Sequence, residues 1–370
     1  MPLEIRIVSD SEYRAVNDFF NNTRNINVPA KKTPRGYPEF CWEFIDGPAG
    51  KAIYAAAWEV EAGKEPVIVG IQGLIPLKMI ASDGATFLTA KGEDTLIDIK
   101  ALIRYKETDI LRELYLVLFE ECRKRGIKQV WGFNSTYATN QRLGFELPVR
   151  SHYCALVLDP LRTYQNNVSQ KTGIQFSEKG KILGQALLSR LYSLRKFFIP
   201  SSIGNYRFNT GMDDNRELFQ RAAGPEPYFF LCQESTYFKW RITENPYPVK
   251  YRSFQLSDPS NVFKAQLICS IHEGAAFIEQ LLFEQGTEKS ALYSLLKRAI
   301  RSLKEEKVYM IRYIGFDSNA LNKKEMKMLR DLGFVKTKKG EQFNFLNLSD
   351  DLIIKPENVY LSRLYKQGIN

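Results

Sequence analysis

The sequence is poor in the residue types that build metal centres and disulfide frameworks. It has two histidines, His152 and His272, and five scattered cysteines with no Cys-x-x-Cys spacing. A zinc site, a His-rich metal centre and a disulfide scaffold are therefore not expected. We expect both histidines to be structural or surface residues and the thiols to stay reduced.

Long apolar runs and an amino-terminal signal pattern are also missing. No run approaches the roughly 18 apolar residues that a membrane-spanning helix needs. The opening MPLEIRIVSDSEYR has no basic stretch followed by an apolar one. Together with the scattered cysteines, these absences predict a cytoplasmic protein without a membrane span.

What is present is the composition of a globular protein with a basic surface. Of 370 residues, 44% are hydrophobic and 25% are charged, and the formal net charge is +10. These values exclude a disordered chain and leave enough length for two domains. The basic excess lies mostly in residues 297–307 and 322–340 and favours anionic partners. No Arg–aromatic stripe is evident, so nucleic acid is the minority interpretation.

The two halves of the chain share a pattern at a constant offset. Trp42 matches Trp240 and Pro48 matches Pro246, since 240 − 42 = 198 and 246 − 48 = 198. An aromatic face can line an acceptor pocket. Recurrence at equal positions favours packing instead, because one binding role would not be needed twice.

The same order of elements recurs in both halves. Apolar stripes with helical period predict helices over residues 109–126 and 289–307, and Gly126 is expected as the residue after the first helix. Strand-like runs flank both helices, among them residues 67–81 and 95–99. We therefore predict an α/β chain (α+β, with mixed sheets), in which each half is a twisted sheet flanked by helices.

The order of these patterns divides the chain into three parts. We predict one domain over residues 1–160, a linker with a basic helix over 161–200, and a second domain over 201–370. Four leucines (Leu183, Leu187, Leu191 and Leu194) give the linker helix an apolar face. We expect this face to dock on one of the domains, with a membrane surface as the alternative.

Three features together resemble the GNAT N-acetyltransferase superfamily in a tandem arrangement. They are the tryptophan followed six residues later by a proline, the strand–turn–helix at residues 95–125, and the Leu-Gly-Phe that closes each half at 143–145 and 332–334. The resemblance covers nearly all of the chain except the linker, and the first half is similar to a bacterial subgroup of predicted acyltransferases. It implies two GNAT-like domains that pair within one monomer.

In that family, the turn after the central strand carries Gln/Arg-x-x-Gly-x-Gly/Ala, and its amides bind the pyrophosphate of acetyl-CoA or another acyl-CoA. In this sequence Lys106 takes the first position and Asp109 the first glycine position. The resemblance implies that the cofactor-binding residues are Ile97, Ile99, Lys106, Thr108, Asp109, Ile110 and Asn134. Since the turn lacks glycine, a plain helix N-cap at Asp109 is the competing interpretation.

The family's catalytic residues are also incomplete here. The general-acid tyrosine would stand four residues before Gly144 or Gly333, where this sequence has Asn140 and Leu329. Tyr137 is the nearest substitute. For the general base, the resemblance and the position before the central strand favour Glu93 and Asp94, with Asp98 inside the strand as a weaker candidate.

The corresponding turn of the second half departs further from the motif. It holds one glycine, Gly286, at a spacing that does not fit. We expect this half to pack, to shape the cleft or to bind the acceptor.

Three functions remain open at this point. The first is an N-acyltransferase that moves an acyl group from acyl-CoA to a small-molecule amine, with an amino sugar or cell-envelope precursor as the acceptor that the resemblance suggests. The second is a Fem-like aminoacyltransferase that uses aminoacyl-tRNA, which the positive charge would suit. The third is a non-catalytic binding protein with a GNAT fold, which the two degenerate turns would suit.

Overall fold

The computed structural model describes most of the chain. The described residues are 2–27, 34–134, 141–168, 199–212, 216–224, 228–352 and 354–365, with the single positions 180, 183, 184, 187, 191 and 226.

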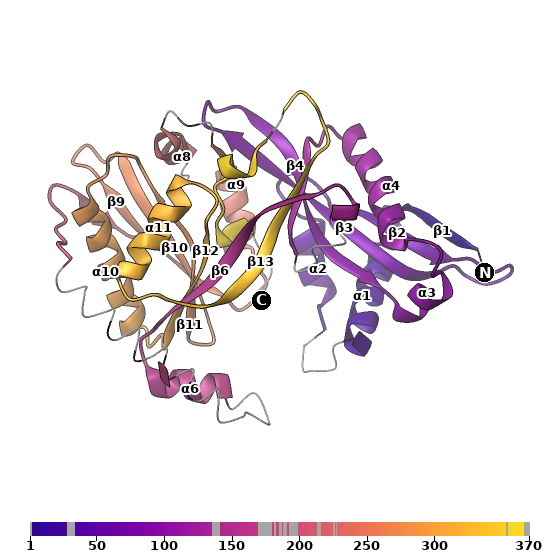
Figure 1. Cartoon of the computed structure of the whole chain (residues 1–370), viewed down its shortest axis with the longest axis horizontal. Coiled ribbons are helices and arrows are strands. Elements are labelled where there is room, and N and C mark those ends of the chain that lie inside the picture. Colours follow the sequence, from indigo (N-terminus) through magenta and orange to yellow (C-terminus); the bar gives the residue numbers. More distant parts are fainter. Residues whose placement is uncertain are drawn as a thin grey trace.

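One mixed sheet runs through both halves (Figure 1). Across the described residues it has 13 strands in the order β1-β2-β3-β4-β5-β13-β6-β12-β11-β10-β9-β7, and β8 pairs with β3 off this path. The strands are β1 Leu3–Ile7, β2 Ile53–Glu59, β3 Val67–Ala81, β4 Thr86–Ile97, β5 Gln129–Asn134, β6 Glu146–Val157, β7 Arg207–Asn209, β8 Phe229–Leu231, β9 Lys250–Ser257, β10 Phe263–His272, β11 Ala275–Phe283, β12 Met310–Phe316 and β13 Val335–Asn347.

The two halves exchange their last strands. β6, from the first half, pairs with β12 of the second half, and β13, from the second half, pairs with β5 of the first. β6 and β13 also pair with each other, so they lie side by side at the centre of the sheet (Figure 1). The sheet is continuous because of this exchange, and neither half completes its own set of strands.

Helices cover both faces of the sheet in the first half. Aromatic side chains of α1 and α2 pack with Tyr54 and Trp131 on one face, and α4 packs on the other. The second half packs α8, α10 and α11 with the inner side chains of β9 to β12. The helices are α1 Tyr13–Asn27, α2 Tyr37–Phe44, α3 Ile99–Arg104, α4 Ile110–Lys124, α6 Pro160–Val168, α8 Arg216–Ala223, α9 Ser235–Phe238, α10 Lys289–Glu305 and α11 Ala320–Asp331.

The predicted helical stripes form the core contacts of α4 and α10. Leu114, Leu118 and Cys122 are buried in the first helix, and Leu292 and Leu296 in the second. Gly126 has φ of 71°, a left-handed conformation that suits glycine just after a helix, as predicted.

Two local predictions were wrong. The strand expected at residues 95–99 ends at Ile97, because Asp98 is the N-cap of α3 and its carboxylate accepts a hydrogen bond from the backbone N–H of Lys100. The three linker leucines that the structure describes do not dock as expected, because Leu183, Leu187 and Leu191 are 64%, 60% and 53% exposed. Leu194 lies outside the described residues.

Trp42 and Trp240 join the two halves. Their rings stack with centroids 5.3 Å apart, and each indole N–H donates to the backbone carbonyl of the other residue, at 2.8 and 2.7 Å. The reciprocal geometry is that of a pseudo-two-fold axis, and it confirms the packing role predicted from the repeat.

Candidate functional site

The parallel strands β4 and β5 separate part-way along their length. Their ladder runs from Thr89↔Gln129 to Lys91↔Trp131 and ends there. Beyond that point β4 keeps its pairing with β3, and β5 keeps its pairing with β13. We call the place where residues 92–97 of β4 and 132–134 of β5 no longer pair with each other the β4–β5 wedge. At its narrow end two glycines meet: a Cβ on Gly132 would lie 3.6 Å from the carbonyl oxygen of Gly92.

A β-bulge lies in β4 at the wedge. Gly73 pairs with Glu93 and Ile71 with Leu96, so Gln72 alone faces both Asp94 and Thr95. Asp94 has φ of 53°, a left-handed conformation that is unusual for a residue with a side chain. A bulge re-aims the backbone, so amides of β4 turn away from the ladder with β3.

The side chain of Gln72 fixes this bulge. Its Nε2 donates to the carbonyl of Glu93 at 3.0 Å and to that of Gly73 at 2.8 Å, while its Oε1 accepts from the hydroxyl of Thr95. Gln72 is fully buried, so these bonds are shielded from water.

Asp94 is held by two partners from other elements. Arg35 forms a bidentate pair with its carboxylate, at 2.7 and 3.2 Å, and the hydroxyl of Tyr54 donates to it at 2.8 Å. The Arg35 and Asp94 side chains are each 8% exposed. The carboxylate is therefore occupied by structural contacts, and it is poorly placed to take a proton from a substrate.

Arg35 is itself fixed by aromatic rings and by α1. Its guanidinium lies 4.2 Å from the ring centroid of Phe20, 4.8 Å from that of Phe44 and 5.0 Å from that of Phe40. Its Nε donates to the Oδ1 of Asn17 at 3.0 Å. The cation therefore belongs to the rigid frame of the bulge.

A second carboxylate, Glu43 of α2, lies beside this pair. Its Oε2 is 3.9 Å from the guanidinium of Arg35. Burial, reinforced by the negative charges of Glu93 and Asp94, raises the pKa of Glu43 to about 7. A carboxyl group with such a pKa gains and loses a proton readily at neutral pH, which is the property of a general base.

Lys91 and Glu93 complete the charged groups on β4. Lys91 is almost fully buried, and its ammonium pairs with the carboxylate of Glu93, whose side chain is 30% exposed. Both interact electrostatically with Glu43. The structure thus gathers Arg35, Glu43, Tyr54, Lys91, Glu93 and Asp94 around the bulge, and we call this set the bulge cluster.

Sequence reasoning found Glu93 and Asp94 but missed the other four members. Arg35, Glu43 and Tyr54 come from separate elements, and nothing in their spacing links them to β4. Two weak signals existed: Glu43 follows the repeated Trp42, and Lys91 stands two residues before Glu93 in the same strand-like run.

The predicted cofactor turn is a helix cap. Asp109 is the N-cap of α4, and its carboxylate accepts from the backbone N–H of Arg112 at 3.2 Å and lies 3.6 Å from Arg142. Ile110 is buried in the core, and its backbone N–H donates to the carbonyl of Thr108 at 2.9 Å. The side chain of Lys106 is 78% exposed beside Glu107, and Thr108 is exposed in the preceding turn.

The remaining predicted residues lie at the ends of the wedge or outside the described chain. Ile97 ends β4 and Ile99 begins α3, where Ile99 is 55% exposed. Asn134 is the last residue of β5, and its backbone pairs with Gln342. Tyr137 lies outside the described residues.

In the second half two parallel strands also separate, but the carboxy-terminal segment lies in the space between them. β11 and β12 pair from Ala275↔Met310 to Ile278↔Tyr313 and then part. The carboxy-terminal segment occupies the space beyond, where the hydroxyl of Tyr360 donates to the carbonyl of Leu281 at 3.0 Å and to Glu325.

Helix α11 anchors the same segment. Asn322 donates to the carbonyl of Leu361 at 2.7 Å and accepts from its backbone N–H at 3.1 Å. Glu325 also accepts from the hydroxyl of Tyr313 on β12 at 3.0 Å. Across the described residues of this half, the carboxy-terminal segment therefore lies where the first half has the β4–β5 wedge.

Comparisons with known proteins identify the fold. No model of a known protein family matches, and no curated protein matches. Among solved structures, a conserved protein of Enterococcus faecalis V583 described as a probable N-acyltransferase aligns with TM-score 0.59 at 9% identity, over 94% of this chain and 73% of that one.

Two further solved structures agree. A tandem GNAT protein from the clavulanic acid biosynthesis pathway aligns with TM-score 0.53 at 12% identity, over 94% of this chain and 99% of that one. Saccharomyces cerevisiae N-myristoyltransferase with bound myristoyl-CoA aligns with TM-score 0.53 at 13% identity, over 94% and 81%. The chain therefore has the tandem GNAT fold, as the sequence motifs predicted.

The described residues hold neither a membrane-spanning helix nor a group of metal-binding side chains. No helix there combines the length and the apolar character needed to cross a bilayer. Likewise, no three His, Cys, Asp or Glu side chains in that part of the chain are grouped so that they could hold a metal ion.

Proposed function

We propose that the protein is an N-acyltransferase that moves an acyl group from acyl-CoA to an amine, and that the first half carries the reaction. The observation that carries the proposal is the separation of β4 and β5 beyond Lys91 and Trp131, with a β-bulge and a charged cluster beside it. GNAT chemistry requires an opening of this kind for the pantetheine arm and a backbone amide turned toward the thioester carbonyl, where it stabilises the developing oxyanion.

Glu43 is the proposed general base. The amine forms a C–N bond to the acyl carbon as the C–S bond breaks, its proton passes to the Glu43 carboxylate, and the CoA thiolate leaves. A pKa of about 7 suits this transfer. Asp94, engaged by Arg35 and Tyr54, acts as a positioning residue that holds the bulge.

The seat of the pyrophosphate differs from the glycine-rich turn of the family. At α4 the Asp109 carboxylate already occupies a backbone N–H. Basic side chains lie close by, since Arg112 belongs to the first turn and Arg142 pairs with Asp109. We propose that the phosphates bind these cations and Lys106, with Asp109 giving up Arg142 on binding.

For the acceptor we propose only a chemical class. A small-molecule amine fits a site whose base is a buried carboxyl group, and an amino sugar or cell-envelope precursor is the acceptor that the family resemblance suggests. We also propose that the two halves work within one monomer in the cytoplasm, with domains bounded near residues 160 and 200.

A thiol-release assay tests this function. Acetyl-CoA is incubated with the protein and a panel of primary amines, including amino sugars, and the freed CoA thiol is measured. We expect amine-dependent release that Glu43→Gln lowers by about 100-fold, the usual size of a general-base contribution. Glu120→Gln, on the exposed face of α4 and paired with Lys124, is the control and should keep full activity.

The pH profile separates the roles of the carboxylates. If Glu43 is the base, the rate rises with pH through about 7 in the wild type, and this limb is lost in Glu43→Gln. Release that needs no amine, or a Glu43→Gln variant with the wild-type profile, would contradict the assignment.

A further inference from the structure

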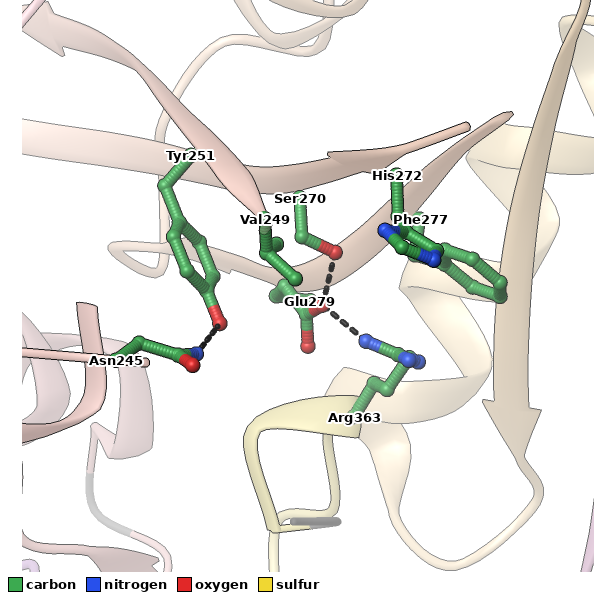
Figure 2. Close-up of a pocket in the computed structure, with 8 residues that line it drawn as sticks. All are labelled: Asn245, Val249, Tyr251, Ser270, His272, Phe277, Glu279 and Arg363. Carbon is green, nitrogen blue, oxygen red and sulfur yellow. Dashed lines mark hydrogen bonds and ion pairs between the residues drawn. The ribbon is translucent and has the colours of Figure 1, made fainter. Parts of the chain in front are cut away.

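A group of buried charges in the second half leaves no room for a ligand. Figure 2 shows the carboxylate of Glu279 joined to the hydroxyl of Ser270 and to the guanidinium of Arg363. The Arg363 and Glu279 side chains are 5% and 0% exposed. The cavity beside them has a volume of about 10 Å³, which is space for one water at most. This pair therefore belongs to the interior of the second half and is closed to a ligand.

The linker between the two halves, in contrast, exposes a row of leucines. Leu183, Leu187 and Leu191 are each more than half exposed, and all three are helical. Because an α-helix has 3.6 residues per turn, side chains four positions apart lie on the same face. We call these three side chains the leucine row. Exposed apolar side chains gathered on one face indicate an interaction surface.

The sequence around the leucine row carries charge of one sign. Residues 179–212 include six basic residues and neither aspartate nor glutamate. Five of the six fall within residues 179–198, and they are Lys179, Lys181, Arg190, Arg195 and Lys196. The same stretch contains the aromatic residues Tyr192, Phe197 and Phe198. A leucine face in a basic, aromatic-containing sequence is typical of helices that lie in the interface of a membrane with anionic lipids.

Charge also distinguishes between the partners that could cover the leucine row. A second copy of the chain has the same basic stretch and a formal net charge of +10, so two copies repel each other. A groove on an acidic protein would accept the leucines and is the competing partner. An anionic bilayer suits both features together, because apolar side chains enter the acyl region while cations stay among the head groups.

We propose that the linker binds an anionic lipid surface, with the leucine row inserted among the acyl chains and the five basic residues of 179–198 attracted to the lipid phosphates. The partner is thus a bilayer rich in anionic phospholipid. This binding needs neither the β4–β5 wedge nor the bulge cluster, so it stands or falls separately from acyl transfer.

Vesicle co-sedimentation of the full chain tests the proposal. One set of vesicles is pure phosphatidylcholine, and the other contains equal parts of phosphatidylcholine and anionic phosphatidylglycerol. We expect saturable binding to the anionic vesicles and at least about tenfold weaker binding to the neutral ones, because the attraction of the five cations is lost. High salt should weaken binding to the anionic vesicles for the same reason.

A triple variant tests the leucine row, with Leu183→Gln, Leu187→Gln and Leu191→Gln combined. Since these side chains are exposed, we expect the variant to unfold at the same temperature as the wild type. It should bind anionic vesicles at least about tenfold more weakly, because apolar area no longer enters the bilayer.

The matched control makes the same change at three exposed side chains of α3, with Ile99→Gln, Leu102→Gln and Ile103→Gln combined. These side chains are 55%, 46% and 71% exposed, so the control removes a similar apolar surface from another part of the chain. It should bind vesicles as the wild type does. A further variant, in which the five basic residues of 179–198 become glutamine, should lose the preference for anionic vesicles.

Four results would overturn the proposal. A folded wild type that stays in the supernatant with both kinds of vesicle would leave an acidic protein as the partner. Equal binding to neutral and anionic vesicles would remove the role of charge, and a leucine-row variant that binds as well as the α3 control would remove the role of the leucines. A dimer that forms without lipid and that the leucine-row variant dissociates would assign the row to a second copy of the chain.

Discussion

At the residue scale, the chemistry that we propose for the bulge cluster depends on which of its carboxylates is free to accept a proton. Asp94 is the residue that the family resemblance favoured, yet Arg35 and Tyr54 occupy both of its oxygens. Glu43 has the raised pKa and lies at the longer distance of 3.9 Å from Arg35. Burial and neighbouring charge, which come from the fold, are the reason that we propose Glu43 as the base.

This difference predicts a pH dependence of stability. The folded-state pKa of Glu43, about 7, lies above the ordinary value of 4.5. Between pH 4.5 and pH 7 the folded protein therefore keeps a proton on Glu43 that the unfolded chain has lost. Stability should therefore fall as pH rises from about 4.5 to about 7, by about 3 kcal/mol from this group. Glu43→Gln removes that loss.

Urea unfolding at pH 5 and pH 8 measures the effect. Glu43→Gln should match the wild type at pH 5 and exceed it at pH 8. Glu325, whose pKa burial raises to about 8, titrates in a similar window but is present in both proteins, so it does not affect the comparison. An equal change in the free energy of unfolding between pH 5 and pH 8 for the two proteins would show that burial does not raise the pKa of Glu43.

At the scale of single elements, the sequence predicted the helices better than the turn before them. Apolar periodicity located α4 and α10 to within a few residues, because the stripe is what the core selects. The prediction of a pyrophosphate-binding turn relied on a glycine motif that this chain lacks. The pattern also gave no sign of the short helix α3 before that turn. Local spacing cannot reveal that a short helix is inserted, since Asp98 and Asp109 are both ordinary N-caps.

The cap at Asp109 gives a prediction of its own. Asp109→Ala removes the acceptor of the Arg112 N–H and should lower the free energy of unfolding by about 1 kcal/mol. Asp109→Asn keeps a side-chain acceptor and should stay close to the wild type. Chemical denaturation of the three proteins gives the answer, and an unchanged Asp109→Ala would mean that the cap contributes nothing.

At the scale of the whole molecule, the exchange of β6 and β13 was beyond sequence reasoning. The repeat correctly predicted two similar halves and the packing of Trp42 on Trp240. It could not show which half each final strand joins, because both strands have the same pattern and either partner would satisfy it. Which half each final strand pairs with depends on contacts that form only when the whole sheet is assembled.

The exchange predicts that the halves depend on each other. Residues 1–160 and 201–370 expressed alone should each lack a native strand neighbour and should unfold without cooperativity or aggregate. Coexpression should restore a one-to-one complex. Size-exclusion chromatography and circular dichroism distinguish this outcome from two stable monomers, which would mean that each half can take back its own strand.

The central claim is that the β4–β5 wedge accepts acyl-CoA, and calorimetric titration with acetyl-CoA tests it most directly. The wild type should bind at micromolar concentration, and Gly92→Val, which places branches beside Tyr115 and Trp131 at the narrow end, should bind at least about tenfold more weakly. Thr86→Val, at the far end of β4, is the matched control and should bind normally. A folded wild type that gives no heat with acetyl-CoA or CoA would contradict the account.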